Sequence, residues 1–170
     1  MNRHIAESLH VFTDPIALSQ HLNTVVQKAS ESASSNSRKF TIALSGGSLA
    51  SQIMLEAPKT RQETSHWQIL FADERCVSLT SPDSNSALFH ALFKLWGIKE
   101  SQVLNISQSF LFDPEKCAQM YQDELVKLFE GVIGIPELDL VLLGMGPDGH
   151  TCSLFPGHEL LDEKVLLSLC

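Results

Sequence analysis

Short apolar runs alternate with longer amphipathic segments along this chain of 170 residues. Five runs have the length and composition of buried strands: residues 9–12, 40–44, 67–72, 103–106 and 138–143. The segments between them carry apolar residues at helical spacing. Strands that alternate with helices are typical of an α/β fold with an open, mostly parallel sheet and helices on both faces. No repeat and no linker divides the chain, so we expect a single domain over residues 1–170.

Capping residues and prolines mark the expected ends of the helices. Asp14 and Asp113 each precede a proline, which is favoured in the first turn of a helix, and residues 82–84 open a third helix. A short helix is expected over about residues 49–57. The polar, serine-rich residues 30–38 are expected to end the first helix and form a loop.

Charge and composition narrow the possible partners. Hydrophobic residues make up 44% of the chain and charged residues 19%, which is typical of a folded globular protein. The 12 basic and 20 acidic residues give a net charge of −8. This balance argues against nucleic acid as the main partner, but a few local cations suffice to bind a phosphorylated small molecule.

Targeting and metal-binding signals are absent from the sequence. No segment has the apolar length of a membrane span, and the first residues lack the apolar core of a signal peptide. The four cysteines are irregularly spaced, so we expect reduced thiols and a cytoplasmic location. The sequence contains neither a C-x-x-C pair nor an H-E-x-x-H element, the motifs that would indicate a zinc site.

The loop after residues 138–143 carries an unusual set of residues. Three glycines, a proline, Asp148 and His150 lie within the seven residues 144–150. Glycine lets a backbone approach a ligand closely, and ligands of open α/β sheets bind at the carboxyl ends of strands. His150 is suited to act as a general base, and Asp148 to fix its tautomer. Gly146 is a candidate for contact with the substrate.

Two other loops follow predicted strands and are expected to meet the first at one crevice. The loop Ser45-Gly46-Gly47-Ser48 offers backbone amides that suit a phosphate, although an ordinary turn explains it equally well. In the other loop, Arg75 can bind a phosphate or polarise a carbonyl, and Asp73 can orient a hydroxyl or a water.

Water activated by His150 is the preferred nucleophile. The sequence has no G-x-S-x-G elbow to present a serine. Cys152 lies two residues after His150 and is the alternative nucleophile, but a cysteine in such a place is more often a small packing residue. A structural role for the histidine remains the alternative to catalysis.

These three loops together resemble the 6-phosphogluconolactonase family. The motifs are S-G-G-S after one strand, D-E-R after the next, and G-x-G-x-D-G-H-T-x-S-L-F-P-G later in the chain. The third is long and specific, and the resemblance extends from about residue 11 to about residue 163. It implies a Rossmann-like fold, shared with the glucosamine-6-phosphate deaminase/isomerase family. In that sister family an asparagine- and glutamate-containing segment follows the histidine, whereas here Ser153-Leu154-Phe155-Pro156-Gly157 follows.

The resemblance also implies an activity and roles for individual residues. The reaction would be hydrolysis of 6-phospho-D-glucono-1,5-lactone to 6-phosphogluconate in the oxidative pentose phosphate pathway, with neither a metal nor an organic cofactor. His150 matches the family's base and Arg75 its substrate-binding arginine. Gly46, Gly47 and Ser48 match its phosphate and sugar loop, and Asn85 lies in a segment near the family's site.

The last residues, 165–170, do not resemble the family's continuation, which brings further strands and cations. We therefore expect a lactonase-like domain whose C-terminal part is missing. Three hypotheses stay open: a lactonase that is active when completed, a non-catalytic remnant, and a sugar-phosphate isomerase or deaminase of the sister type. The sequence gives no indication of the oligomeric state.

Overall fold

The computed structural model describes residues 9–57, 63–129 and 135–162. Its elements, in chain order, are α1 (Pro15–Ser35), β1 (Phe40–Leu44), α2 (Leu49–Met54), β2 (Trp67–Phe71), α3 (Asn85–Trp96), the 3-10 turn η1 (Glu100–Gln102), α4 (Pro114–Leu128), β3 (Leu140–Leu142) and the 3-10 turn η2 (Glu159–Asp162).

The described strands form one parallel sheet in the order β2-β1-β3. Ile42 in the central strand β1 lies opposite Ile69 of β2 and Leu140 of β3. Every residue of β1 is buried, which explains why its sequence is a nearly continuous apolar run rather than an alternating one. The α/β fold with an open, mostly parallel sheet is confirmed.

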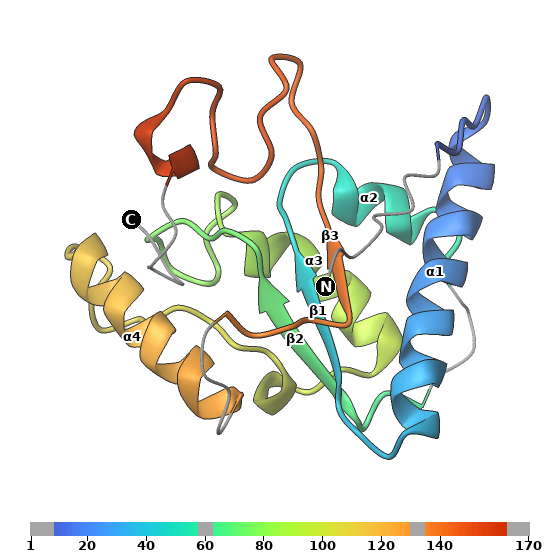
Figure 1. The fold of residues 1–170 in the computed structure, drawn as a ribbon, viewed down its shortest axis with the longest axis horizontal. Coiled ribbons are helices and arrows are strands. Elements are labelled where there is room, and N and C mark those ends of the chain that lie inside the picture. The colour runs from blue at the N-terminus through green and yellow to red at the C-terminus, as the bar shows by residue number, and fades with distance from the viewer. Residues whose placement is uncertain (1–8, 58–62, 130–134, 163–170) are drawn as a thin grey trace.

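Helices cover both faces of this sheet (Figure 1). Phe40, Ile42 and Leu44 face the larger core, which they share with buried residues of α1, α2 and α3. Ala43 points to the opposite face, because successive side chains of a strand alternate. There it packs in a smaller core with Leu70 and with Leu125 of α4.

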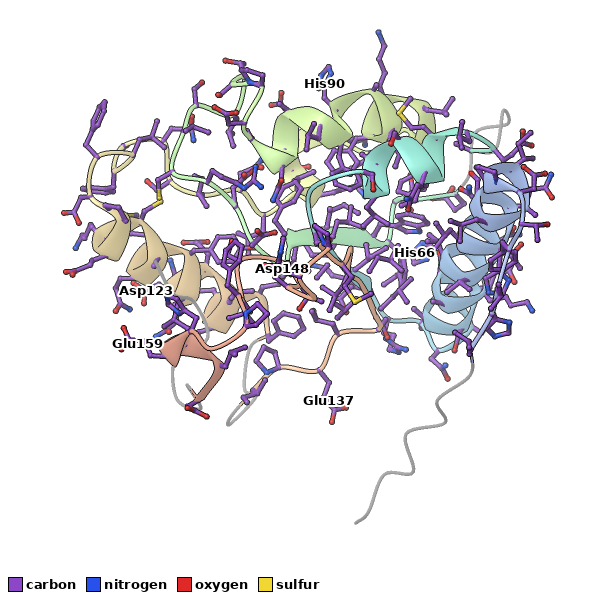
Figure 2. All side chains as sticks on the ribbon, turned by 90° about the horizontal axis from the view of Figure 1, so that it is seen from above. His66, His90, Asp123, Glu137, Asp148 and Glu159 are labelled. Atoms are coloured by element: carbon purple, nitrogen blue, oxygen red, sulfur yellow. The ribbon has the colours of Figure 1, made fainter. Side chains whose placement is uncertain are left out.

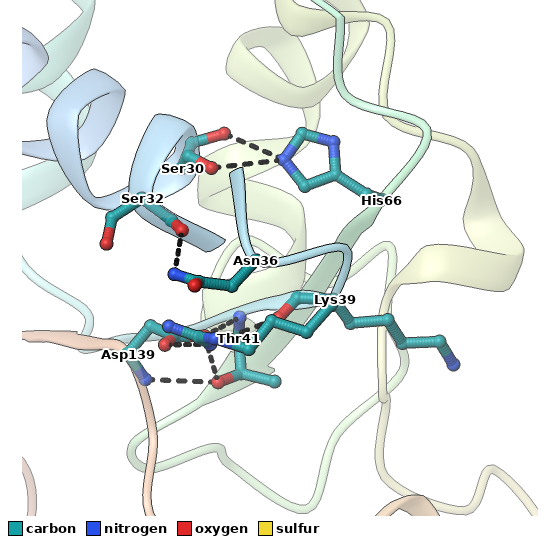
Figure 3. Close-up of polar contacts among 8 residues, drawn as sticks. Ser30, Ser32, Asn36, Lys39, Thr41, His66 and Asp139 are labelled. Carbon is teal, nitrogen blue, oxygen red and sulfur yellow. Dashed lines mark hydrogen bonds and ion pairs between the residues drawn. The ribbon is translucent and has the colours of Figure 1, made fainter. Parts of the chain in front are cut away.

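Helix α1 is longer than expected and includes most of the serine-rich segment. The helix ends at Ser35, inside the segment 30–38 that was expected to hold the helix end and a loop, but the loop is confined to the last residues of that segment. The Ser30 hydroxyl accepts a hydrogen bond of 2.7 Å from the indole Nε1 of Trp67. It also lies 3.1 Å from Nε2 of His66, a contact that Figure 3 shows. Local polarity suggested a loop, but tertiary partners satisfy the hydroxyl inside the fold.

A carboxylate joins the beginning of β1 to the beginning of β3. Asp139 accepts hydrogen bonds from the backbone N–H of Thr41 at 2.8 Å and from its hydroxyl at 3.0 Å (Figure 3). It also forms an ion pair with Arg38. Burial raises the pKa of Asp139, but the hydrogen bonds from Thr41 and Arg38 outweigh burial and hold the pKa below its ordinary value. Asp139 therefore favours the folded state as a carboxylate.

Three strand expectations need correction. Residues 9–12 form no strand, and Leu9 and Val11 are 90% and 78% exposed, because no neighbouring strand in the described ranges pairs with them. The expected strand at residues 103–106 is reduced to one bridge between Val103 and Ile69. Strand β3 has three residues rather than six, since only these pair with β1.

Two further bounds differ by a few residues. Strand β2 ends at Phe71 rather than at residue 72, and α2 ends at Met54 rather than at residue 57. The helix caps were predicted well. Asp14, Ser84 and Asp113 each accept a hydrogen bond from a backbone N–H in the first turn of the helix that follows.

Candidate active site

The three predicted loops meet at the carboxyl ends of the parallel strands, where a pocket of about 170 Å³ opens. In Figure 1 the chain after β3 rises above these strand ends. The pocket brings together eight of the ten predicted site residues: Ser45, Gly46, Gly47, Ser48, Asp73, Arg75, Gly146 and His150. Asp148 and Asn85 do not line it, but each contacts a residue that does.

The first loop is attached to the third and packs against Asn85 at the start of α3. The Ser45 hydroxyl accepts a hydrogen bond of 2.8 Å from the backbone N–H of Gly144. A Cβ atom on Gly46 would lie 2.1 Å from Oδ1 of Asn85, so any other residue at position 46 would require the buried Asn85 side chain to move. Gly47 has a φ of +73°, a backbone conformation that glycine adopts without strain. The loop conformation thus depends on both glycines.

The third loop folds back on itself around Gly146. The N–H of Gly146 donates to the carbonyl of His150 at 2.8 Å. A Cβ atom on Gly146 would lie 2.1 Å from Cε1 of the His150 ring. Gly146 was predicted to contact the substrate, and in the structure it also leaves room for the imidazole.

His150 and Asp148 form a dyad at the pocket. Nδ1 of His150 lies 2.5 Å from Oδ1 of Asp148, and the side chains of the two residues are 29% and 51% exposed. An ionised carboxylate can only accept, so Nδ1 carries the proton, and in the neutral form of the imidazole Nε2 is the nitrogen with the lone pair. The hydrogen bonds from His150 hold the pKa of Asp148 below its ordinary value. Asp148 lies over the centre of the molecule in Figure 2, whereas Glu137 and His90 lie at opposite margins.

The Asp73 carboxylate is held from two sides. Asn85 Nδ2 donates to the Asp73 backbone carbonyl at 2.7 Å and to its Oδ1 at 3.2 Å. The hydroxyl of Ser153, from the third loop, donates to Oδ2 of Asp73 at 2.8 Å. Asp73 therefore faces the pocket in a fixed orientation. Asn85 is fully buried, and its Oδ1 has no hydrogen-bond partner among the described residues.

Arg75 is the cation that lines the pocket. Its Nη1 donates to the backbone carbonyl of Asp83 at 2.8 Å, so the start of the α3 segment holds one branch of the guanidinium. The side chain is exposed, and a guanidinium presents five N–H donors in a fixed plane. This arrangement suits an anionic or carbonyl oxygen in the pocket.

Cys152 lines the pocket, but its surroundings do not suit a nucleophile. Burial and the neighbouring charge of Asp73 raise the pKa of the thiol to about 11. Since the thiolate is the nucleophilic form, little of it is present near neutral pH. The structure therefore favours activated water over Cys152.

The family profile of glucosamine-6-phosphate isomerases/6-phosphogluconolactonase matches residues 13–169. The chain belongs to this family. A probable 6-phosphogluconolactonase of Schizosaccharomyces pombe is 39% identical over 168 residues, with 93% of this chain and 65% of that protein covered. The 6-phosphogluconolactonase of Bos taurus is 40% identical over 164 residues, with 92% and 62% covered.

A solved structure of a family member supports the same fold. The crystal structure of 6-phosphogluconolactonase from Leishmania guyanensis superposes with a TM-score of 0.79 at 24% identity, with 94% of this chain and 68% of that chain covered. The chain spans only 62–65% of the length of the curated relatives named above. The open α/β fold expected for the family is thus confirmed.

The described residues of this chain lack a metal cluster and a membrane-spanning helix. They contain no group of three or more His, Cys, Asp or Glu side chains placed to hold a metal ion. No helix among them has the length and apolar character needed to span a membrane.

Several residues that shape the site are not among those predicted from the sequence. Gly144 and Met145 line the pocket, Ser153 orients Asp73, and Glu74 binds the start of α3. Ser153 and Glu74 both lie inside the motifs quoted above, but Ser153 bonds to Asp73 on the loop after β2 and Glu74 bonds to the start of α3. Local patterns do not contain that information, because it depends on how the loops meet.

Proposed function

We propose that this chain carries the catalytic site of a 6-phosphogluconolactonase, which hydrolyses 6-phospho-D-glucono-1,5-lactone to 6-phosphogluconate. The observation that carries the proposal is the His150–Asp148 dyad in a pocket shared with Arg75 and the Gly46-Gly47 turn. The names of the relatives support the same substrate.

In the proposed reaction, Nε2 of His150 takes a proton from a water molecule. The water oxygen attacks the lactone carbonyl carbon, and a tetrahedral oxyanion forms. When this intermediate collapses, the bond between the carbonyl carbon and the ring oxygen breaks, and the imidazolium returns its proton to the leaving oxygen. Asp148 keeps Nδ1 protonated throughout and stabilises the imidazolium.

Binding is assigned to the other two loops. Arg75 would pair with the phosphate or polarise the carbonyl, and the backbone N–H groups after Ser45 would donate hydrogen bonds to oxygen atoms of the substrate. Asp73, which Asn85 and Ser153 hold in place, would orient a hydroxyl or the attacking water. Helix α2 has only six residues, so the amides of the loop matter more here than its helix dipole.

The remaining parts of the proposal follow from the sequence. Residues 1–170 would form a single lactonase-like domain that works in the cytoplasm, without metal or cofactor and without nucleic acid as a partner. A second candidate is a chain that binds the sugar phosphate but does not turn it over. The observation that favours this candidate is the coverage of the relatives, which is below two thirds.

The test is to supply fresh 6-phosphogluconolactone to residues 1–170 and to follow acid release after subtraction of spontaneous hydrolysis. Catalysed release that His150→Ala abolishes supports the lactonase. Binding of 6-phosphogluconate without turnover supports the second candidate. Ammonia release from glucosamine 6-phosphate would instead support the sister activity. If the chain shows neither lactone hydrolysis, nor binding of 6-phosphogluconate, nor ammonia release, the proposal for this chain is contradicted.

A further inference from the structure

We infer that Glu74 is a positioning residue that holds Asp73 and Arg75 at the pocket, an inference that rests on the proposed function. Glu74 lies between these two pocket residues in the loop after β2, but it does not itself line the pocket. Its side chain is directed to the beginning of α3 instead. A role in the reaction must therefore act through its neighbours.

The carboxylate of Glu74 accepts four hydrogen bonds. Oε1 accepts from the backbone N–H groups of Arg75 at 2.8 Å and Asn85 at 2.7 Å. Oε2 accepts from the hydroxyl of Ser84 at 3.0 Å and from the backbone N–H of Ser86 at 2.9 Å. A carboxylate has about four acceptor sites. Since all of these are used, Glu74 has a structural connection to make rather than a ligand to bind.

Two of these donors are the first backbone N–H groups of α3, which have no partner within the helix. A negative charge is also favourable at this end of a helix. Helix α3 is anchored in the larger core by Phe89, Leu92, Phe93 and Trp96. Glu74 thus fastens the pocket loop to a rigid element.

The same short segment at the start of α3 also contacts both neighbours of Glu74. Arg75 Nη1 donates to the Asp83 carbonyl, and Asn85 Nδ2 donates to Asp73. The Arg75 side chain is long and exposed, so an unanchored backbone would let it sample many positions. Anchoring the loop reduces the entropy that is lost when Arg75 binds an anion.

The first experiment measures positioning without a ligand. We compare the NMR order parameter of the Arg75 side-chain Nε–H in the wild-type chain, in Glu74→Gln and in Asp113→Asn. Asp113 is a matched control, because its carboxylate caps α4 outside the pocket. In Glu74→Gln the order parameter should fall, to below about 0.6, while Asp113→Asn should leave it unchanged. An unchanged Arg75 signal in Glu74→Gln would overturn the inference.

The second experiment is a double-mutant cycle on the affinity for 6-phosphogluconate. Glu74→Gln should weaken binding by about tenfold in the wild-type background and by less than about twofold in Arg75→Ala. Equal losses in both backgrounds would mean that Glu74 does not act through Arg75, and would overturn the inference. If the wild-type chain fails to bind 6-phosphogluconate, the proposed function fails, and the NMR comparison still decides the role of Glu74.

Discussion

The two ends of the sheet use carboxylates in opposite ways. At the amino ends of β1 and β3, Asp139 is largely enclosed and bonds to Thr41 and Arg38, away from the residues that line the candidate active-site pocket. At the carboxyl ends, Asp73 and Asp148 are each fixed by neighbouring side chains and stand in or beside an open pocket. The same chemical group therefore serves folding at one end and is available for chemistry at the other.

The largest effect expected at the carboxyl end is on catalysis. His150→Ala should lower catalysed lactone hydrolysis by roughly 10²–10⁴-fold, the usual contribution of a general base. The melting temperature should change little, because the His150 side chain is partly exposed and its side-chain contacts, the hydrogen bond to Asp148 and the ring contact with Phe155, stay within the same loop. Acid release and the melting temperature are the two measurements. If the unsubstituted chain hydrolyses the lactone and His150→Ala does so at a near-normal rate, His150 is not the base.

Chain length should have the next largest effect. In the described sheet β3 pairs only with β1, and Val141, Leu143 and Met145 are 45%, 49% and 78% exposed. An unpaired edge and apolar patches favour aggregation. We expect residues 1–170 to be poorly stable and to bind 6-phosphogluconate about a hundredfold more weakly than a family-length relative does, as expected if one or two charge-assisted contacts are absent.

The control for chain length is a full-length relative, such as the 6-phosphogluconolactonase of Bos taurus, measured at the same protein concentration. Light scattering, a melting curve and lactonase turnover are compared side by side. A soluble chain of 170 residues that melts cooperatively and turns over lactone at a comparable rate would refute this prediction. It would also show that the pocket is complete without further strands.

A smaller effect is expected from the packing of the first loop. Gly46→Ala would drive a methyl group into Oδ1 of Asn85 and should destabilise the fold by about 1–3 kcal/mol, while it also weakens ligand binding. Gly144→Ala is the matched control, because its Cβ would meet nothing closer than 3.6 Å. Chemical denaturation measures the free energy of unfolding of both variants. Equal stability of the two variants would mean that Asn85 moves aside easily.

The amino end of the sheet should respond in stability alone. Asp139→Asn should lower the free energy of unfolding by about 1.5–3 kcal/mol at neutral pH, the usual range for hydrogen bonds to a charged group. Lactone hydrolysis per folded molecule should not change. A loss of turnover equal to that in His150→Ala would remove the distinction between the two ends of the sheet.

The stability that Asp139 contributes should depend on pH with a definite sign. Its pKa is lower in the folded protein than its unfolded value of about 3.9, so its contribution is fully present above that value. The contribution is lost as the pH falls through the folded pKa, because the unfolded state binds the proton more tightly. The difference in unfolding free energy between wild type and Asp139→Asn should therefore shrink below about pH 4. A constant difference would contradict the lowered pKa.

The sequence by itself determined the α/β fold class, the three paired strands and the start of each longer helix. Apolar runs predict buried parallel strands, and Asp14 and Asp113 mark helix starts because capping is a local interaction. The sequence also placed three loops at one edge, since parallel strands end on the same side of a sheet. These features depend on residues that are neighbours in the chain.

Only the tertiary structure decided how the loops support one another. Ser153 and Asp73 are 80 residues apart in the chain, and Asp139 and Thr41 are 98 apart. The serine-rich end of α1 is helical because Ser30 forms hydrogen bonds with Trp67 and His66. Residues 9–12 are not a strand because no described strand pairs with them. Pairing and hydrogen bonding between distant segments depend on the folded arrangement, which local patterns do not contain.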